Sequence, residues 1–429
     1  MSDRSTLRIQ KELNEIGKNP ERHFQLWYDD NNIKHVHAML TGPPHTPYAL
    51  GMFDFVFNMG EDYPVGPPKV TALTTAGGKT RFNPNIYANG KVCLSILGTW
   101  EGEKWSAAHG LASVLISIQS LLSEDPYHNE PGHEKEKDKK VLGDYNAKLL
   151  HETIRISVID RLEEYLGWRS ADPKLESLIG ARGHTFCSCR TKSPFINVAK
   201  EMFLMYKHLY DDTLVEEKAK GRDGKSFVLT RFEAGGNRCD GSFDYQSLRD
   251  RLDALQKALL AEPEQWLVDS RQWLADESTT ASNLRAQFQQ IKASKDYDTS
   301  VLMDLEDNNP YAWNLSVVKL PNTYDGGIFR AQMRFHNDFP EVRPRIRFEC
   351  EVFHPHVSKD GIPYIRVQRP DNVRDYLDAL CDLFMADPSS DPSTHLNVKA
   401  TKMWFGTKEE RRDFNRNARR CGQKTLEEC

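Results

Sequence analysis

An internal repeat is the feature of this sequence that most restricts how the chain can fold. Motifs from the first third of the chain recur in the last third, in the same order. Residues 48–53, Asp62-Tyr63-Pro64 and Pro68 match residues 324–329, Asp338-Phe339-Pro340 and Pro344, always 276 positions further on. After a Gly-rich insertion at 76–80, Pro84, Gly90 and Cys93 match Pro355, Gly361 and Tyr364, now 271 positions further on. The two regions are therefore expected to share one fold.

Length and composition indicate how many domains the chain has and which kinds of protein it can be. With 429 residues the chain exceeds one ordinary core, so two or three domains are expected. A net charge of −5 argues against wholesale nucleic-acid binding. There is no apolar run of about 18 residues and no signal-like N-terminus, so we expect no membrane span. A cytoplasmic or nuclear protein is expected, in which the eight cysteines remain thiols.

The hydrophobic pattern predicts an α+β domain in each copy. The predicted strands are residues 34–40, 53–58 and 70–73 in the first copy, and 313–318, 328–335 and 345–348 in the second. Helices are predicted at 5–17 and 106–123, the first with Leu7, Ile9, Leu13 and Ile16 facing inward.

The sequence pattern predicts a mostly helical region between the two copies. Residues 130–140 are charged and are expected to form an exposed connector. Helices are predicted at 145–166, 201–220 and 245–260, and the Gly-rich stretch 221–241 is expected to be a mobile loop. We expect three parts: a catalytic core at 1–130, a helical extension and connector at 131–282, and a second domain at 283–429.

One cysteine stands in an informative context. A lone Cys is usually a small core residue, but Cys93 follows the turn signal Asn89-Gly90, so we expect its thiol near the surface. Asn85 lies eight residues earlier, across that reversal. Its amide is placed either to stabilise the oxyanion formed when a thioester is attacked or only to hold the turn. Cys187 and Cys189 have no matching Cys/His pair nearby, so we expect no metal site.

These residues belong to a longer pattern that resembles the ubiquitin-conjugating enzyme family. The pattern comprises Thr46-Pro47-Tyr48, Asp62-Tyr63-Pro64, Pro67-Pro68-Lys69-Val70, Asn83-Pro84-Asn85, Cys93, Trp105 and the helix with Ser117 to Leu122. The resemblance is strongest to the Z-type enzymes, which share the sequence 90–100, Asn129-Glu130-Pro131-Gly132, 151–155 and 243–248, so it extends to about residue 260. It implies two folds, each a four-stranded antiparallel meander flanked by helices.

The resemblance also implies the chemistry and the partners. Cys93 would accept ubiquitin or a relative from an activating enzyme by thioester exchange, then pass it to a substrate lysine or a ligase. Asn85 would be the oxyanion or loop-organising amide. The typical first residue of that motif is His, whereas this chain has Asn83, a change that the Z-type enzymes share. No metal or organic cofactor is needed, since ATP is used by the activating enzyme; neither membrane nor DNA is expected as a partner.

Two further groups of residues each have a functional interpretation and an ordinary structural one. His128, or Asn129 with a shift of one residue, occupies the region where family members orient the incoming lysine, but it also fits an ordinary loop residue. Arg4, Arg8 and Lys11 lie on the helix face that the family uses toward the activating enzyme, but without the resemblance solvated helix charge is the preferred explanation.

The second copy, residues 283–425, resembles the R-type conjugating enzymes without their nucleophile. Tyr364 stands at the Cys position and His356 at the Asn position. A phenol with a pKa of about 10 does not replace a thiol in thioester exchange, so we expect a pseudo-enzyme domain. The segment 399–424 is rich in Lys and Arg and is expected to form basic helices. The alternative function for the whole chain is a non-catalytic adaptor for ubiquitin or a ligase, built from two such domains.

Overall fold

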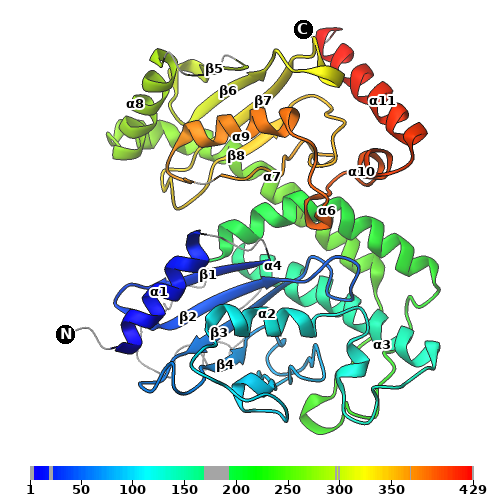
Figure 1. Ribbon diagram of the computed structural model, residues 1–429. Coiled ribbons are helices and arrows are strands. Elements are labelled where there is room, and N and C mark those ends of the chain that lie inside the picture. Colours follow the sequence, from blue (N-terminus) through cyan, green and yellow to red (C-terminus); the bar gives the residue numbers. More distant parts are fainter. Residues whose placement is uncertain are drawn as a thin grey trace. The chain divides into compact units, whose positions relative to one another are not determined.

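The computed structural model describes residues 4–427 except 19–22, 169–192, 295–296, 298–299 and 368 (Figure 1). The chain divides into two compact units. Unit 1 holds residues 1–199 and 212–252, and unit 2 holds residues 200–211 and 253–429. Cys187 and Cys189 lie outside the described residues. None of the described helices is long and apolar enough to cross a membrane.

Unit 1 contains a four-stranded antiparallel sheet in the order β1-β2-β3-β4. The strands are β1 (Phe24–Asp29), β2 (Asn32–Thr41), β3 (Met52–Asn58) and β4 (Lys69–Ala72). In the register of β2 and β3, Ala38 pairs with Phe55. The three strands predicted here are confirmed, whereas β1 was not located. It is an edge strand of mostly half-buried residues, so it lacks the clear alternation that marks its neighbours.

Two helices flank this sheet, α1 (Arg4–Lys18) and α2 (Leu111–Leu121). Ile9 and Leu13 are buried as predicted, but the inward placement of Leu7 is wrong, because it is 53% exposed. The start of α2 at Leu111 is also later than predicted. A carboxylate oxygen of Glu12 on α1 accepts a hydrogen bond from the Leu111 backbone N–H at 2.9 Å, which satisfies one donor of the first turn.

The segment predicted as one helix at 145–166 is three. They are α3 (Lys139–Glu152), the π-helix η3 (Thr153–Asp160) and α4 (Arg161–Tyr165). The π-helix and the start of α4 contact the sheet. Ser157 Oγ in the π-helix accepts a hydrogen bond from Met52 N, and Arg161 in α4 forms an ion pair with Asp54 at 2.6 Å. The π-helix therefore occurs where the chain packs against β3, and the hydrophobic periodicity of the sequence does not predict it.

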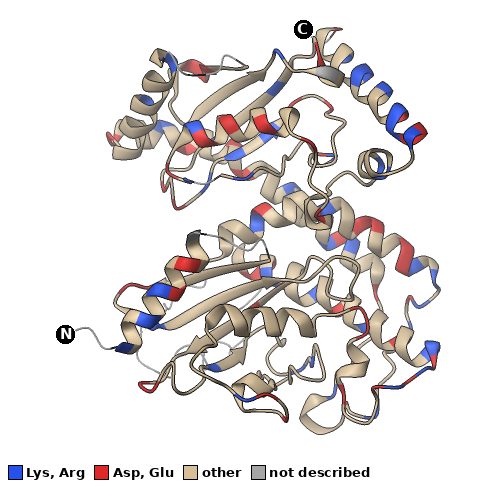
Figure 2. Cartoon of the chain, viewed as in Figure 1, with Lys and Arg blue, Asp and Glu red and all other residues tan. Residues whose placement is uncertain are grey.

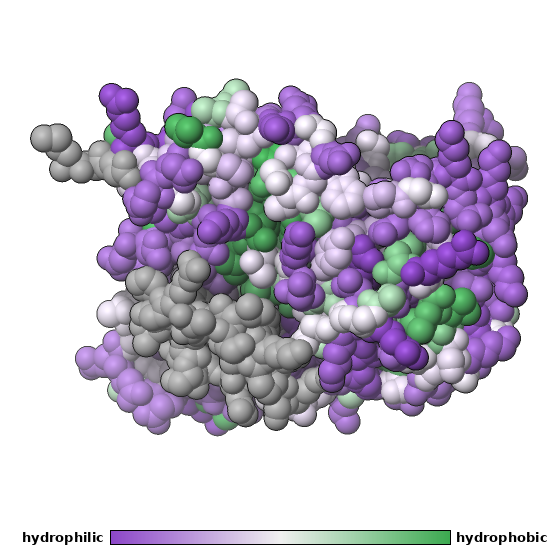
Figure 3. All heavy atoms as spheres, turned by 90° about the horizontal axis from the view of Figure 1, so that it is seen from below, coloured by the Kyte–Doolittle hydropathy of each residue, from purple (hydrophilic) through white to green (hydrophobic). Residues whose placement is uncertain are grey.

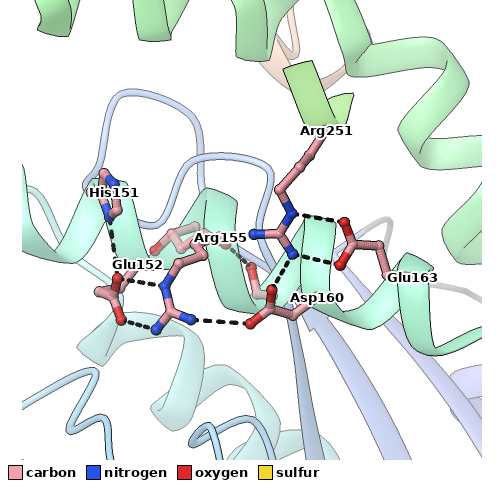
Figure 4. A network of polar contacts seen from close by, with 8 residues as sticks. His151, Glu152, Arg155, Asp160, Glu163 and Arg251 are labelled. Carbon is pink, nitrogen blue, oxygen red and sulfur yellow. Dashed lines mark hydrogen bonds and ion pairs between the residues drawn. The ribbon is translucent and has the colours of Figure 1, made fainter. Parts of the chain in front are cut away.

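A polar network ties this π-helix and α4 to a helix much later in the chain (Figure 4). Arg155 bonds Glu152 and Asp160, and Arg251 bonds Asp160 and Glu163. Arg251 lies on α7 (Tyr245–Ala275), which is longer than predicted; α6 (Ile196–Ala219) precedes it. A pocket of about 340 Å³ opens beside the network.

Residues 224–243, which we call the cap loop, are not the mobile loop expected from their glycines. Lys148 on α3 forms an ion pair with Glu233, and both side chains are 0% exposed. The Phe232 ring packs against Tyr127 and Tyr145 with ring centroids 5.1 and 5.5 Å away. Buried charge and aromatic packing from distant residues thus order a segment that its own sequence leaves undetermined.

Unit 2 repeats the architecture around its own core. Its sheet is antiparallel, in the order β5-β6-β7-β8, and was predicted except for the edge strand β5. The elements are α8 (Thr279–Ala293), β5 (Val301–Leu305), β6 (Ala312–Val317), β7 (Phe329–Arg334), β8 (Arg345–Phe348), α9 (Val373–Met385), α10 (Val398–Phe405) and α11 (Lys408–Glu427). The described residues also form the short 3-10 helices η1 (Ser95–Leu97), η2 (Pro126–Asn129), η4 (Gly235–Asn237), η5 (Glu306–Asn308), η6 (Asn322–Tyr324) and η7 (Pro392–Thr394). The α+β fold class with two such sheets is confirmed.

Matched residues make matched contacts in the two units. Tyr48 Oη donates to the carbonyl of Phe82 at 2.6 Å, and Tyr324 Oη donates to the carbonyl of Phe353 at 2.8 Å. Each copy has a cis peptide bond, before Pro64 and before Pro340. The sequence repeat is therefore a structural repeat.

Hydrophilic side chains cover most of the described part of one face. In that view from below, apolar side chains gather in limited patches (Figure 3). Lys and Arg follow α11, the predicted basic helix, where Arg412, Arg419 and Arg420 are exposed (Figure 2).

Candidate active site

Residues 82–93, which we call the strap, carry the predicted site and are held to the core by Asn83. Its Nδ2 donates to the Leu121 carbonyl at 2.8 Å and to Tyr48 Oη at 3.0 Å. Its Oδ1 accepts from the Asn85 backbone N–H at 2.9 Å. One amide thus supplies donors and an acceptor together. These contacts give Asn83 a structural role at the position where the family pattern usually has His.

The predicted turn before Cys93 is present, and it requires glycine. Gly90 has φ +89°, and a Cβ at this position would lie 2.6 Å from the carbonyl oxygen of Ala72. The matched Gly361 has φ +80°, with a Cβ position 2.4 Å from the carbonyl oxygen of Phe348. Left-handed backbone and close approach to the neighbouring strand explain why both copies keep Gly here.

Asn85 reaches back across this turn, as its spacing predicted. Its Nδ2 donates to the backbone carbonyl of Cys93 at 2.8 Å, and the Cys93 N–H donates to the carbonyl of Asn85 at 2.8 Å. The amide is therefore engaged in organising the strap. Its use toward an oxyanion, the other interpretation of Asn85, stays a prediction.

Replacing Asn85 with Ala is expected to slow discharge of a Cys93 thioester to lysine by roughly 100-fold, because it removes both the donor and the strap contact. Loss of the hydrogen bond should cost about 1 kcal/mol in the free energy of unfolding. Single-turnover discharge and thermal melting measure the two effects. A variant that melts lower but discharges at the wild-type rate would restrict Asn85 to a structural role.

The Cys93 thiol does not lie at the surface, contrary to the expectation. Cys93 is 1% exposed. The turn signal located the reversal of the backbone correctly, but it does not specify the side to which the following side chain points. Burial raises the pKa of the Cys93 thiol, while the positive charges of Lys91 and Arg81 counteract part of that rise. The surroundings of the sulfur thus contain groups that favour the thiolate.

His128 is half-buried in η2. Its Nε2 lies 3.0 Å from the carbonyl oxygen of Glu136, so this nitrogen must carry a proton and donate. Base chemistry would therefore fall to Nδ1. The alternative residue, Asn129, donates to the Leu121 carbonyl at 3.3 Å. The acceptor-orienting role of either residue stays a prediction.

The three basic residues of α1 differ in what they contact. Arg4 and Lys11 are exposed, and Lys11 lies 3.7 Å from Glu15. Arg8 forms an ion pair with Glu12 and donates to the His109 carbonyl at 3.2 Å. Glu12 also accepts from Tyr63 Oη at 2.6 Å, so Arg8 neutralises a carboxylate that joins α1 to the core.

The second copy keeps the geometry of the strap without its chemistry. Tyr364 N–H donates to the carbonyl of His356 at 2.8 Å, which reproduces the bond between Cys93 and Asn85. The His356 ring lies 3.1 Å from Thr394 Oγ1. The turn before Tyr364 is held by His208, whose Nε2 lies 2.9 Å from Asp360 Oδ2. A phenol and an imidazole therefore stand where the first copy has a thiol and an amide.

Sequence reasoning gave no role to Arg81 or Tyr87, which both lie beside the thiol. The Arg81 guanidinium is 4.4 Å from the centre of the Tyr87 ring. The only sequence signal was their position, since Tyr87 lies in the strap and Arg81 directly precedes it. Arg81 gave no further signal because it contacts Glu130 and Phe232, which are far along the chain.

Comparisons with known proteins agree with this geometry. The family described as "Ubiquitin-conjugating enzyme" matches residues 8–148 and 283–422, so both copies carry its pattern. Ubiquitin-conjugating enzyme E2 Z of Xenopus tropicalis is 39% identical over 60% of this chain and 72% of its own length. The E2 Z protein of Homo sapiens is 40% identical over 59% of this chain and 63% of its own length. The probable ubiquitin-conjugating enzyme E2 R521 of Acanthamoeba polyphaga mimivirus is 40% identical over 35% of this chain and 11% of its own length. The predicted Z-type resemblance is confirmed, and the chain belongs to the ubiquitin-conjugating enzyme family.

Proposed function

We propose that Cys93 is the residue that carries the acyl group in this ubiquitin-conjugating enzyme. It takes ubiquitin or a ubiquitin-like protein from an activating enzyme and passes it to a substrate lysine or to a ligase. The observation that carries this proposal is the strap: Cys93 stands at its end, the Asn85 side-chain amide donates to its backbone carbonyl at 2.8 Å, and Lys91 and Arg81 lie near enough for their charges to favour its thiolate. A non-catalytic adaptor would not need these groups around a thiol.

The chemistry follows from thioester exchange. The Cys93 thiolate attacks the carbonyl carbon of the donor thioester, and a new S–C bond forms as the S–C bond to the activating enzyme breaks. The donor cysteine leaves as a thiolate with the electron pair. Because one thioester replaces another, the exchange needs no cofactor on this chain, and ATP is used by the activating enzyme. A reducing compartment, the cytoplasm or nucleus, keeps Cys93 available as a thiol.

Burial of Cys93 adds a step to this scheme. A donor carbonyl must come within about 3.5 Å of the sulfur for attack. With Cys93 1% exposed, the groups that cover its sulfur have to move before the donor arrives. Arg4 and Lys11 on α1 are free to speed the encounter with an acidic partner, while Arg8 serves mainly the fold. Unit 2, which has Tyr364 in place of the thiol, serves binding or scaffolding.

The test mixes the full chain with an activating enzyme, ATP and ubiquitin or a relative, each pairing separately. We expect an adduct that disappears with reductant, and peptide mass spectrometry that finds the modifier on Cys93. An adduct located on another cysteine would overturn the assignment. If no pairing in a complete panel of modifiers and activating enzymes loads the chain, the adaptor function replaces the enzyme.

A further inference from the structure

The chain turns back directly after Cys93, and this turn returns Thr99 to the cysteine. Residues 95–97 form the short helix η1, and Gly98 follows it with φ +67°. Glycine adopts this left-handed conformation without steric cost, and here it reverses the direction of the chain. The Thr99 backbone N–H then donates to the carbonyl of Leu94 at 3.2 Å, which closes the turn. The side chain of Thr99 is thereby brought beside the neighbours of Cys93.

The Thr99 hydroxyl bonds the main chain on each side of the cysteine. Its Oγ1 donates to the carbonyl of Val92 at 2.8 Å and accepts from the Leu94 N–H at 3.0 Å. The carbonyl oxygen of Leu94 is a second, longer acceptor at 3.2 Å. A hydroxyl has one hydrogen to donate and lone pairs with which to accept, so both bonds form together. Since Val92 precedes Cys93 and Leu94 follows it, one side chain spans the reacting residue.

Asn85 bonds the remaining polar groups of the same two peptide units. In the unit before Cys93, Thr99 holds the Val92 carbonyl, and the Cys93 N–H donates to the Asn85 carbonyl at 2.8 Å. In the unit after Cys93, its carbonyl accepts from Asn85 Nδ2 at 2.8 Å, and Thr99 holds the Leu94 N–H. Peptide units are planar, so fixing both planes fixes φ and ψ of Cys93 and the direction of its Cα–Cβ bond. We call Asn85 and Thr99 the clamp.

The second copy shows which of these bonds the fold itself needs. The Tyr364 N–H donates to the carbonyl of His356 at 2.8 Å, so the main-chain bond of the strap is kept. The side chains of the clamp are replaced. His356 stands in place of the amide, and Pro370 stands six residues after Tyr364, as Thr99 stands six residues after its thiol. Proline has no hydroxyl, so the copy without a nucleophile builds the same strap without the bonds of Thr99.

We propose that Thr99 is a positioning residue for thioester exchange: with Asn85 it fixes the peptide units around Cys93, so that the sulfur keeps its direction as the acyl group arrives and leaves. The groups that cover the sulfur can then move without displacing the cysteine itself. Misplacing a reacting atom by a fraction of an ångström slows a reaction strongly. Thr99 is exposed, so water competes for its bonds and they add little to stability. The inference rests on the proposed role of Cys93.

Single-turnover charging tests this role, because it separates the rate constant from the fraction of active protein. Thr99→Val keeps the shape of the side chain and removes the hydroxyl. The rate constant at saturating donor should fall roughly tenfold, with full amplitude and a wild-type melting curve. Thr99→Ser keeps the hydroxyl and should recover most of the rate. A reduced amplitude at the wild-type rate constant, or equal losses in the two variants, would overturn the proposal.

Thr46→Val is the matched control in the same unit. Thr46 Oγ1 also donates to a carbonyl, that of Pro43 at 2.8 Å, and accepts a backbone N–H, that of Tyr48 at 3.2 Å. It makes the same two kinds of bond, yet the described structure records no contact between Thr46 and the strap. We therefore expect the wild-type rate constant, and a tenfold loss here would show that the effect of Thr99→Val is not specific to the clamp.

Alkylation of Cys93 by iodoacetamide, located by peptide mass spectrometry, gives a readout that needs no activating enzyme. The wild-type thiol is 1% exposed, so it reacts only when its surroundings open. Because loss of the clamp makes opening easier, Thr99→Val should label roughly threefold faster although it charges more slowly. A general loss of structure or reactivity would not change the two rates in opposite directions, and labelling at or below the wild-type rate would contradict the proposal.

The two readouts separate this inference from the proposed function. A wild-type chain that never forms a thioester, together with faster labelling in Thr99→Val, would refute the function of Cys93 and leave its fixation by Thr99 standing. Normal charging of the wild type, with a Thr99→Val variant that charges and labels identically, would refute only the role of Thr99.

Discussion

Replacing Cys93 with Ala is expected to abolish the reductant-sensitive adduct with ubiquitin or its relative. The loss should be at least roughly 1,000-fold, because the variant lacks the atom that forms the new bond. Gel electrophoresis with and without reductant measures the adduct. The side chain is small and buried, so the variant should fold like the wild type, and a melting curve verifies this.

Two variants complete the prediction. Cys93→Ser should form an adduct that resists reductant, because an oxyester replaces the thioester. Tyr364→Phe, the matched control in unit 2, should charge like the wild type, since a phenol does not take part in the exchange. A reductant-sensitive adduct that persists in Cys93→Ala would place the chemistry on another thiol and refute our assignment.

The second large effect concerns the ion pair under the cap loop. Lys148→Met should destabilise unit 1 by about 3–5 kcal/mol, because it leaves the Glu233 carboxylate buried without its partner. For a unit of this size, that lowers the melting temperature by about 10 °C. Lys148 Nζ also donates to the Val228 carbonyl at 3.3 Å, so the cap loop loses two contacts at once.

Calorimetry and hydrogen exchange of residues 224–243 measure this effect. The control is Lys148→Met combined with Glu233→Leu, which removes both charges and should recover most of the lost stability. If the single variant melts like the wild type and the cap loop exchanges no faster, Glu233 is not held by Lys148 in solution. Local opening of the loop without a lower melting temperature would likewise contradict the prediction.

The two predictions test different parts of the molecule. Cys93 belongs to a pattern that is visible in the sequence, whereas Lys148 and Glu233 are 85 positions apart and gave no local signal. The first asks whether the chemistry is assigned correctly. The second asks whether the extension supports the site, as the contacts between Arg81 and the cap loop indicate.

The sequence alone determined the repeat, the main strands and the position of the candidate cysteine at the end of the turn. Tyr48 matches Tyr324 and Gly90 matches Gly361, in the same order along the chain. Matched residues in the same order require the same backbone in both copies. Alternation along β2, β3 and their counterparts reports burial between near neighbours, which is a local property. Asn85 and Cys93 were brought together correctly, since only a short turn separates them.

Tertiary structure decided the rest, because it depends on contacts between residues far apart in the sequence. The edge strands β1 and β5 and the π-helix depend on the elements that pack against them. Leu7 is exposed because no described element covers its side of α1. The order of the cap loop depends on Lys148, and the direction of the Cys93 side chain depends on the fold around the strap. Arg81 bonds the carbonyl of Phe232, 151 positions away, so only folding brings it to Tyr87 and the thiol. The local sequence pattern identified the candidate cysteine, and long-range packing set how that residue is held.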